Sequence, residues 1–154
     1  MIKVTESPEE TKDLAGFLLK KISKNRPPTS RNKSTVIALE GELGAGKTIF
    51  VKGFAESLGI KQKIKSPTFN LMKVYKIPAT YYKLRTTSHL YHLDCYRLKD
   101  HRDLKVFGIK EILSNSNNIV LIEWSDRVKN ILPKKHIQVH IDHISKNKRK
   151  ITIK

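Results

Sequence analysis

Hydrophobic positions first recur at helical spacing in residues 7–23. The apolar side chains there follow the three- and four-residue repeat of an amphipathic helix, at Leu14, Phe17, Leu18 and Ile22. The segment opens with an N-terminal helix signature, because Ser7 is a good N-cap, Pro8 suits the first helical position and Glu10 completes a capping box. The pattern predicts a helix that packs one face against a core.

Short apolar runs rich in β-branched and aromatic residues predict strands. They occupy residues 1–5, 35–41, 68–75, 89–96, 118–124, 136–142 and 150–154. The run that begins at Thr35 is continuously apolar, which is typical of a strand buried on both faces. A second helix is predicted to begin after this run and to end at Gly59, and a third to cover residues 101–114.

This order of elements predicts an α/β fold. We expect a three-layer sandwich with a mixed, mostly parallel central sheet and helices on both faces. Residues 1–154 fit a single domain, because a chain of this length can close one hydrophobic core. The basic, aromatic-bearing segment 76–88 lacks periodicity and is predicted to be an exposed loop or hairpin tip.

Composition indicates the class of protein and its location in the cell, and says less about its chemistry. The chain is 38% hydrophobic and 29% charged, as in ordinary globular proteins, and it has no apolar run near the roughly 20 residues of a membrane span. A charged N-terminus and the lone Cys95 favour a cytoplasmic location. The net charge of +17 is spread along the chain, which favours a solvated basic surface over a nucleic-acid footprint but leaves RNA contact open.

The stretch GELGAGKT, residues 41–48, is the strongest chemical signal. Gly41, Gly46, Lys47 and Thr48 satisfy the P-loop pattern between a predicted strand and a predicted helix. Glycines let backbone N–H groups surround phosphate oxygens at a helix N-terminus. Lys47 is expected to reach the β- and γ-phosphates, and the Thr48 hydroxyl to bind Mg²⁺. The motif predicts a P-loop NTPase-like domain.

A P-loop site also requires a carboxylate to complete the Mg²⁺ shell. Glu123 and Asp94 are both candidates, since each ends an apolar strand where ligands of α/β sheets collect. Either acid could instead face water, or pair with Arg97. A zinc site among His136, His140 and His143 is disfavoured, because only the first two share a strand face and no cysteine joins them.

The nucleotide is expected to be ATP, since the chain lacks the Asn-Lys-x-Asp string of GTPases. Several segments in order then resemble the TsaE (YjeE) family, the bacterial P-loop ATPase required for threonylcarbamoyladenosine in tRNA. They are LEGELGAGKTIFVKGFAESLGI, KSPTFNLMKVY, HLDCYRL, FGIKEIL and IVLIEW. The resemblance covers nearly the whole chain, although Ile49 and Ser125 depart from the family pattern and the segment 76–90 is longer than usual.

The resemblance implies roles for individual residues. Lys47, Thr68, Asp94 and Glu123 would be catalytic, and Thr48 and Glu123 would bind Mg²⁺. The nucleotide would contact Thr11, Gly41, Gly44, Ala45, Gly46, Lys47, Thr48, Ile49 and Trp124. Ser66, Pro67, Thr68 and Phe69 would form a switch loop, whereas the residues alone indicate only a turn. Which carboxylate positions the attacking water stays open.

The resemblance also implies partners. The chain would be a Mg²⁺-dependent ATPase of low intrinsic activity that acts with TsaD and TsaB, and ATP hydrolysis would reset their complex between turnovers. Contact with tRNA would be indirect or weak, and no membrane is involved; the oligomeric state is left open. The alternatives are a P-loop small-molecule kinase and a basic RNA-binding module. The kinase is less favoured, because such an enzyme needs a lid over a second substrate and the 154 residues show no obvious lid.

Overall fold

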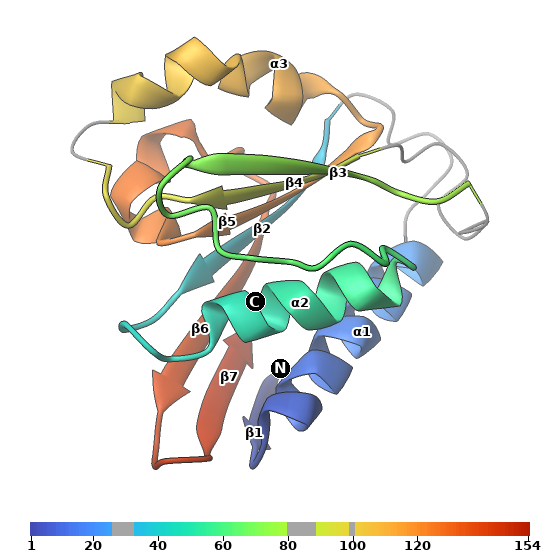
Figure 1. The fold of residues 1–154 in the computed structure, drawn as a ribbon, viewed down its shortest axis with the longest axis vertical. Helices are drawn as coiled ribbons and strands as arrows, with labels where there is room; N and C mark the ends of the chain where they lie inside the picture. The colour runs from blue at the N-terminus through green and yellow to red at the C-terminus, as the bar shows by residue number, and fades with distance from the viewer. Residues whose placement is uncertain (26–32, 80–88, 99–100) are drawn as a thin grey trace.

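A seven-stranded mixed sheet forms the centre of the protein (Figure 1). The computed structural model describes residues 1–25, 33–79, 89–98 and 101–154. The strands are β1 (Ile2–Thr5), β2 (Thr35–Glu40), β3 (Met72–Lys76), β4 (His89–Asp94), β5 (Asn118–Glu123), β6 (Ile137–His143) and β7 (Arg149–Ile153). The helices are α1 (Pro8–Asn25), α2 (Lys47–Ser57) and α3 (Ile109–Ser114), with 3₁₀-helices η2 (His101–Phe107) and η3 (Ser125–Ile131).

The strand order is β1-β7-β6-β2-β5-β4-β3. The four central strands β6, β2, β5 and β4 are parallel to one another, whereas β3 and β7 run against the other strands. β5 is buried along its whole length, as expected for a central strand covered on both faces. The predicted mixed, mostly parallel sheet is therefore confirmed.

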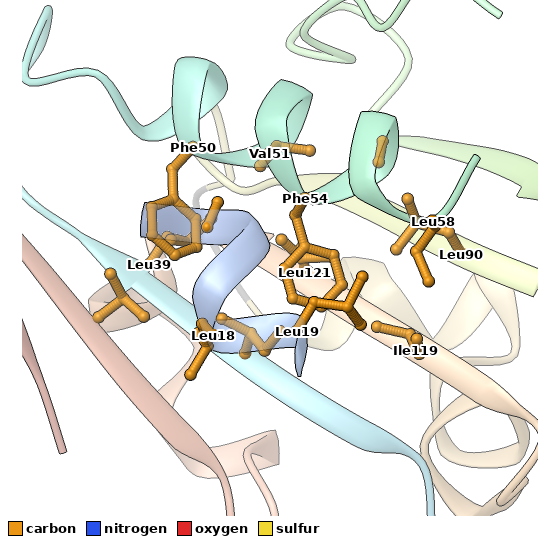
Figure 2. Close-up of a cluster of buried hydrophobic side chains, with 14 of the residues drawn as sticks. Leu18, Leu19, Leu39, Phe50, Val51, Phe54, Leu58, Leu90, Ile119 and Leu121 are labelled. Carbon is orange, nitrogen blue, oxygen red and sulfur yellow. The ribbon is translucent and has the colours of Figure 1, made fainter. Parts of the chain in front are cut away.

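Helices cover both faces of the sheet, which confirms the three-layer arrangement. On one face, α1 and α2 pack against the central strands through a cluster that includes Leu19, Phe50, Phe54, Leu90 and Leu121 (Figure 2). On the other face, α3 and the two 3₁₀-helices enclose a smaller cluster that includes Leu93, Leu104, Ile109, Val120 and Val128. The glycine-rich segment 41–46 joins β2 to α2 at one end of these layers (Figure 1).

The first helix begins where its capping signature predicts. The backbone N–H of Glu10 donates to Ser7 Oγ at 3.1 Å, and the Glu10 carboxylate accepts from the N–H of Glu6 at 2.8 Å. The first bond satisfies a donor that the helix start leaves without an intrahelical partner, and the second ties Glu6, which precedes the N-cap, to the first turn. Helix α1 is thereby fixed next to β1, and its apolar face lies against α2.

The structure corrects two predicted elements and adds a third. The helix predicted over residues 101–114 is divided at Gly108, whose φ of 63° ends η2 and precedes α3. The strand predicted from Thr68 begins only at Met72, because Thr68 turns its hydroxyl toward Asp94. The short helix η3 after β5 was not predicted.

Two further predictions concern the segment 76–88 and membrane-spanning helices. Residues 80–88 of the predicted loop 76–88 lie outside the described residues, while Lys76 ends β3 and Ile77 is buried. In the described ranges, no helix is both long enough and apolar enough to cross a bilayer.

Candidate nucleotide site

The loop between β2 and α2 has the geometry of an anion cradle. Gly44 and Gly46 adopt φ of 78° and 107°, a left-handed region that side chains rarely occupy. A Cβ atom at either glycine would meet nothing within 4 Å, so the space in front of both residues is open to a ligand. Helix α2 starts directly after Gly46, and no side chain caps this end of the helix. The first N–H groups of a helix lack intrahelical partners, which is why helix starts commonly bind phosphate.

The back of the loop is held by neighbouring strands. Gly41, with φ of 140°, lies so close to β6 that a Cβ atom there would be 2.3 Å from the carbonyl oxygen of Ile141. The carbonyl of the fully buried Ala45 accepts a hydrogen bond of 3.0 Å from Arg149 Nε in β7. Gly41 and Ala45 therefore lie against β6 and β7 at the back of the loop.

Lys47 is almost completely buried, with 4% of its surface exposed. Its Nζ donates to the carbonyl oxygens of Gly41 at 2.7 Å and Glu42 at 2.8 Å, and lies 3.8 Å from the ring centroid of Trp124. Burial lowers the pKa of Lys47, while the nearby carboxylates, Glu123 first, act in the opposite direction. The ammonium is thus held at the cradle with little competing water.

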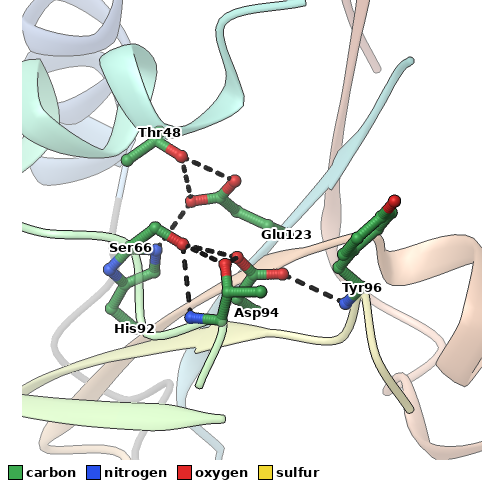
Figure 3. Close-up of polar contacts among 7 residues, drawn as sticks. Thr48, Ser66, His92, Asp94, Tyr96 and Glu123 are labelled. Atoms are coloured by element: carbon green, nitrogen blue, oxygen red, sulfur yellow. Dashed lines mark hydrogen bonds and ion pairs between the residues drawn. The ribbon is translucent and has the colours of Figure 1, made fainter. Parts of the chain in front are cut away.

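Glu123 faces Thr48 across the mouth of the loop (Figure 3). The Thr48 hydroxyl lies 2.9 Å from both carboxylate oxygens of Glu123, which ends β5 and is 2% exposed. A hydroxyl and a carboxylate are hard oxygen ligands, and Mg²⁺ typically takes one or two protein oxygens while phosphates and waters fill the other positions. The pair therefore fits a magnesium ion bound together with a phosphate.

Asp94 organises a second group of polar contacts next to this pair (Figure 3). Its Oδ2 accepts hydrogen bonds of 2.6 Å from both Ser66 and Thr68, and its Oδ1 accepts one of 3.0 Å from the N–H of Tyr96. The hydroxyl oxygens of Ser66 and Thr68 are themselves 2.6 Å apart. The segment 66–69 is thus attached to the end of β4 by hydroxyl groups, and Asp94 is held in one orientation.

Trp124 follows Glu123 in an unusual backbone conformation. Its φ of 58° is one of two positive values at non-glycine residues in the described chain, and its ring packs on Tyr96 at a centroid distance of 4.9 Å. Strain of this kind persists only where surrounding contacts enforce it, and it concentrates at functional sites. Here it brings the indole over Lys47.

These elements enclose a pocket of about 360 Å³. The residues that line it are Leu43, Gly44, Gly46, Lys47, Thr48, Ile49, Ser66, Thr68, Asp94, Tyr96, Glu123 and Trp124. The structure therefore brings together all four predicted catalytic residues and both predicted metal ligands. Thr11 is not part of this lining: its hydroxyl is buried against Thr5 at 2.9 Å and also donates to the Ser7 carbonyl.

Other predicted contacts lie at the rim or elsewhere. Phe69 is 84% exposed, and the Arg97 guanidinium lies 4.4 Å from its ring centroid, whereas Asp94 accepts hydrogen bonds from Ser66, Thr68 and the Tyr96 N–H. Among the described residues, no group of three or more His, Cys, Asp and Glu side chains could hold a metal by itself. A magnesium ion here would accordingly depend on phosphate oxygens and waters for most of its ligands.

Comparison with known proteins assigns the family. The family model of the threonylcarbamoyl adenosine biosynthesis protein TsaE matches residues 5–151. The chain belongs to the TsaE family. Relatives named tRNA threonylcarbamoyladenosine biosynthesis protein TsaE include those of Bacillus subtilis, 36% identical over 96% of this chain and 81% of that protein, and Rickettsia typhi, 35% identical over 96% and 90%. The Haemophilus influenzae relative is 38% identical over 72% of this chain and 65% of its own length.

A solved structure supports the fold of this TsaE-family chain. The crystal structure of YdiB from Bacillus subtilis matches with a TM-score of 0.68 and 29% identity, and the match covers 99% of this chain and 83% of YdiB. Membership of the family places the chain in tRNA threonylcarbamoyladenosine biosynthesis.

Two residues of this TsaE-family site were not predicted from the sequence. His92, fully buried in β4, lies with Nε2 2.8 Å from Glu123 Oε1, and Arg149 in β7 bonds to the loop at Ala45. The alternation of β4 places His92 on the same sheet face as Asp94, and this signal could have indicated it. Arg149 is about a hundred residues from the loop, and the sequence pattern carried no signal for its contact.

Proposed function

We propose that this TsaE-family chain binds ATP with Mg²⁺ at residues 41–48 and hydrolyses it as a subunit of the tRNA threonylcarbamoyladenosine machinery, together with TsaD and TsaB. The observation that carries the proposal is the pairing of Thr48 with Glu123 at 2.9 Å beside the open glycine cradle. This arrangement would supply protein ligands to a nucleotide-bound magnesium ion, and it supports P-loop chemistry over a glycine-rich turn without function.

The residues of the site divide the chemical work. The glycine cradle and Lys47 would bind the phosphates, and Thr48 and Glu123 would hold Mg²⁺, which neutralises charge on the β- and γ-phosphates. Asp94, fixed by Ser66 and by the Tyr96 N–H, would orient the attacking water. This assignment leaves Glu123 to the metal and Asp94 to the water, because Glu123 alone contacts Thr48.

Hydrolysis by the isolated chain is expected to be slow. Lys47 is the one cation among the described residues that line the pocket, and no arginine is among them. An added arginine commonly accelerates P-loop hydrolysis by 10³-fold or more in order of magnitude. We propose that TsaD and TsaB complete the site, and that hydrolysis resets their complex between turnovers.

Nucleotide binding is tested by fluorescence, because Trp124 is the single tryptophan and lies over Lys47. ATP should change the emission of the wild type, more strongly with Mg²⁺ than with EDTA. Lys47→Ala should abolish the change, whereas Lys52→Ala, on the same helix outside the pocket lining, should retain it. Glu123→Ala should mainly reduce the Mg²⁺ effect and turnover. ATP binding by Lys47→Ala equal to that of the wild type would refute the phosphate assignment.

The partner assignment needs a separate measurement. Co-purification with TsaD and TsaB should depend on whether ATP, ADP or no nucleotide is present. A kinase would instead release stoichiometric ADP only when an acceptor is added, and an RNA-binding module would bind tRNA with steep salt dependence and without regard to ATP. Either of these results, with no nucleotide-dependent complex, would replace the proposed function.

A further inference from the structure

His92 lies directly behind the proposed metal ligand Glu123. It belongs to β4, its side chain is completely buried, and its Nε2 is 2.8 Å from Glu123 Oε1 (Figure 3). Its other ring nitrogen, Nδ1, is buried without a hydrogen-bond partner in the described structure. Buried polar atoms are nearly always paired, so the unpaired Nδ1 calls for an explanation, and the contact of Nε2 with Glu123 is the side-chain hydrogen bond that this ring makes in the described structure.

The strand register makes this contact specific. In the parallel pair β4–β5, His92 lies opposite Leu121 and Asp94 opposite Glu123, so all four side chains share the sheet face that α2 covers. His92 therefore occupies an inward position that an apolar side chain would otherwise fill, as Leu90 does two residues earlier. The ring lies between the core under α2 and the pocket at the strand ends.

The chemistry of the contact requires a donor on the histidine. Glu123 offers only acceptor oxygens when ionised, so Nε2 must carry a proton to form a favourable bond at 2.8 Å. Glu123 Oε1 then receives bonds from His92 on the strand side and from Thr48 on the helix side. With donors from both directions, the carboxylate is held in the orientation that faces Thr48.

We propose that His92 is a positioning residue that fixes Glu123 for magnesium and so sets the metal affinity of the nucleotide complex. The inference rests on the proposed function, since it assigns a role toward the Mg²⁺ of that site. Hydrogen bonds behind a metal ligand orient it, and their loss typically lowers metal affinity by about 10–100-fold. His92 does not line the pocket, so its effect passes through Glu123.

Two substitutions separate the hydrogen bond from packing. His92→Gln keeps an N–H donor at similar reach, whereas His92→Met keeps the volume without a donor. Tyr91→Phe is the matched control, because Tyr91 lies on the same strand and packs against the cluster on the opposite face. Thermal unfolding of each variant shows whether the fold is retained.

The measured quantity is the ratio of ATP affinity in saturating Mg²⁺ to ATP affinity in EDTA, followed by Trp124 emission. In His92→Met this ratio should fall about tenfold or more while affinity in EDTA stays within about threefold of the wild type. His92→Gln should recover most of the ratio, and Tyr91→Phe should match the wild type. A histidine that only filled the core would lower stability without changing the ratio.

A double-substitution experiment measures the contact without nucleotide. The unfolding free energies of His92→Met, Glu123→Met and the combined variant should be non-additive, because each single change removes the same hydrogen bond. Additive effects, or an unchanged Mg²⁺ ratio in folded His92→Met, would overturn the role of His92 alone. A wild-type protein without Mg²⁺-dependent ATP binding would overturn the proposed function and this role together.

Discussion

Replacing Gly53 with alanine tests how closely α2, the helix that carries Lys47 and Thr48, approaches α1. A Cβ atom at Gly53 would lie 2.3 Å from Lys12 Cα and 2.6 Å from the Lys12 carbonyl oxygen. These are backbone atoms of another helix, so no side-chain rotation relieves the clash. Gly16, on α1, provides a matched control, because a Cβ atom there would clash with the rotatable Ser57 hydroxyl at 2.5 Å and would make an ordinary contact with Ser57 Cβ at 3.5 Å.

The magnitude follows from this geometry. Carbon atoms pack at about 3.5–4.0 Å, so the helices must separate by more than about 1 Å to accept the methyl group at residue 53. Overpacking of this kind typically costs about 1–3 kcal/mol. Alanine regains up to about 1 kcal/mol of helix propensity over glycine at either position. We expect Gly53→Ala to lose about 1–2 kcal/mol, and Gly16→Ala to be neutral or slightly stabilising.

Thermal and denaturant unfolding of the two variants give the comparison. For a domain of this size, each kcal/mol moves the melting temperature by about 2–4 °C, so the two variants should differ by several degrees. Because the displacement moves the start of α2, Gly53→Ala should also weaken ATP binding, whereas Gly16→Ala should not. Equal melting temperatures for both variants would refute the reasoning that backbone contact at Gly53 sets the spacing of the helices.

Three further predictions concern single side chains. Ser66→Ala removes one of the two hydroxyl donors to Asp94 Oδ2, a charge-assisted bond worth about 1.5–3 kcal/mol. Steady-state ATP turnover should fall by about tenfold or more, while ATP affinity in binding titrations should change little. Burial, with Asp94 and other carboxylates adding to it, raises the pKa of Cys95 to about 12, so at pH 8 only about one thiol in ten thousand is the reactive thiolate. A thiol reagent should therefore label Cys95 only after the protein is unfolded, as followed by mass spectrometry. Arg149→Gln removes the guanidinium that donates to the carbonyl oxygens of Ala45, Ser145 and Lys148. This change should weaken ATP binding severalfold in the Trp124 titration, and unchanged affinity would show that the loop keeps its shape without this contact to β7.

Local patterns were sufficient for most of the architecture. The capping signature of α1 and the apolar runs of β2 and β5 are short-range features, and the structure has each element in the predicted place. The errors occur where a tertiary contact overrides the local pattern. Thr68 would extend a strand by its own propensity, but its bond to Asp94 draws it into a turn, and the positive φ of Gly108 divides a segment whose apolar spacing resembles one helix.

The candidate site divides in the same way. Residues 41–48 are contiguous, so a spacing rule identifies the cradle, and Asp94 and Glu123 are found because parallel strands end at one edge of the sheet. The spacing could not decide between these two acids. The structure gives them different contacts, since Glu123 faces Thr48 and Asp94 faces Ser66.

The inward faces of β4 and β5 change from apolar to polar along their length. On β4 the sequence is Leu90, His92, Asp94, and in the same register β5 contributes Leu121 and then Glu123. Core and pocket are therefore continuous, and the residue at the boundary must both pack under α2 and contact the site. A histidine meets both demands, because its ring fills a buried position while one nitrogen donates toward the carboxylate. In a strand that ends beside a phosphate site, a polar residue two positions before the terminal acid is accordingly a candidate for orienting the ligand on the neighbouring strand.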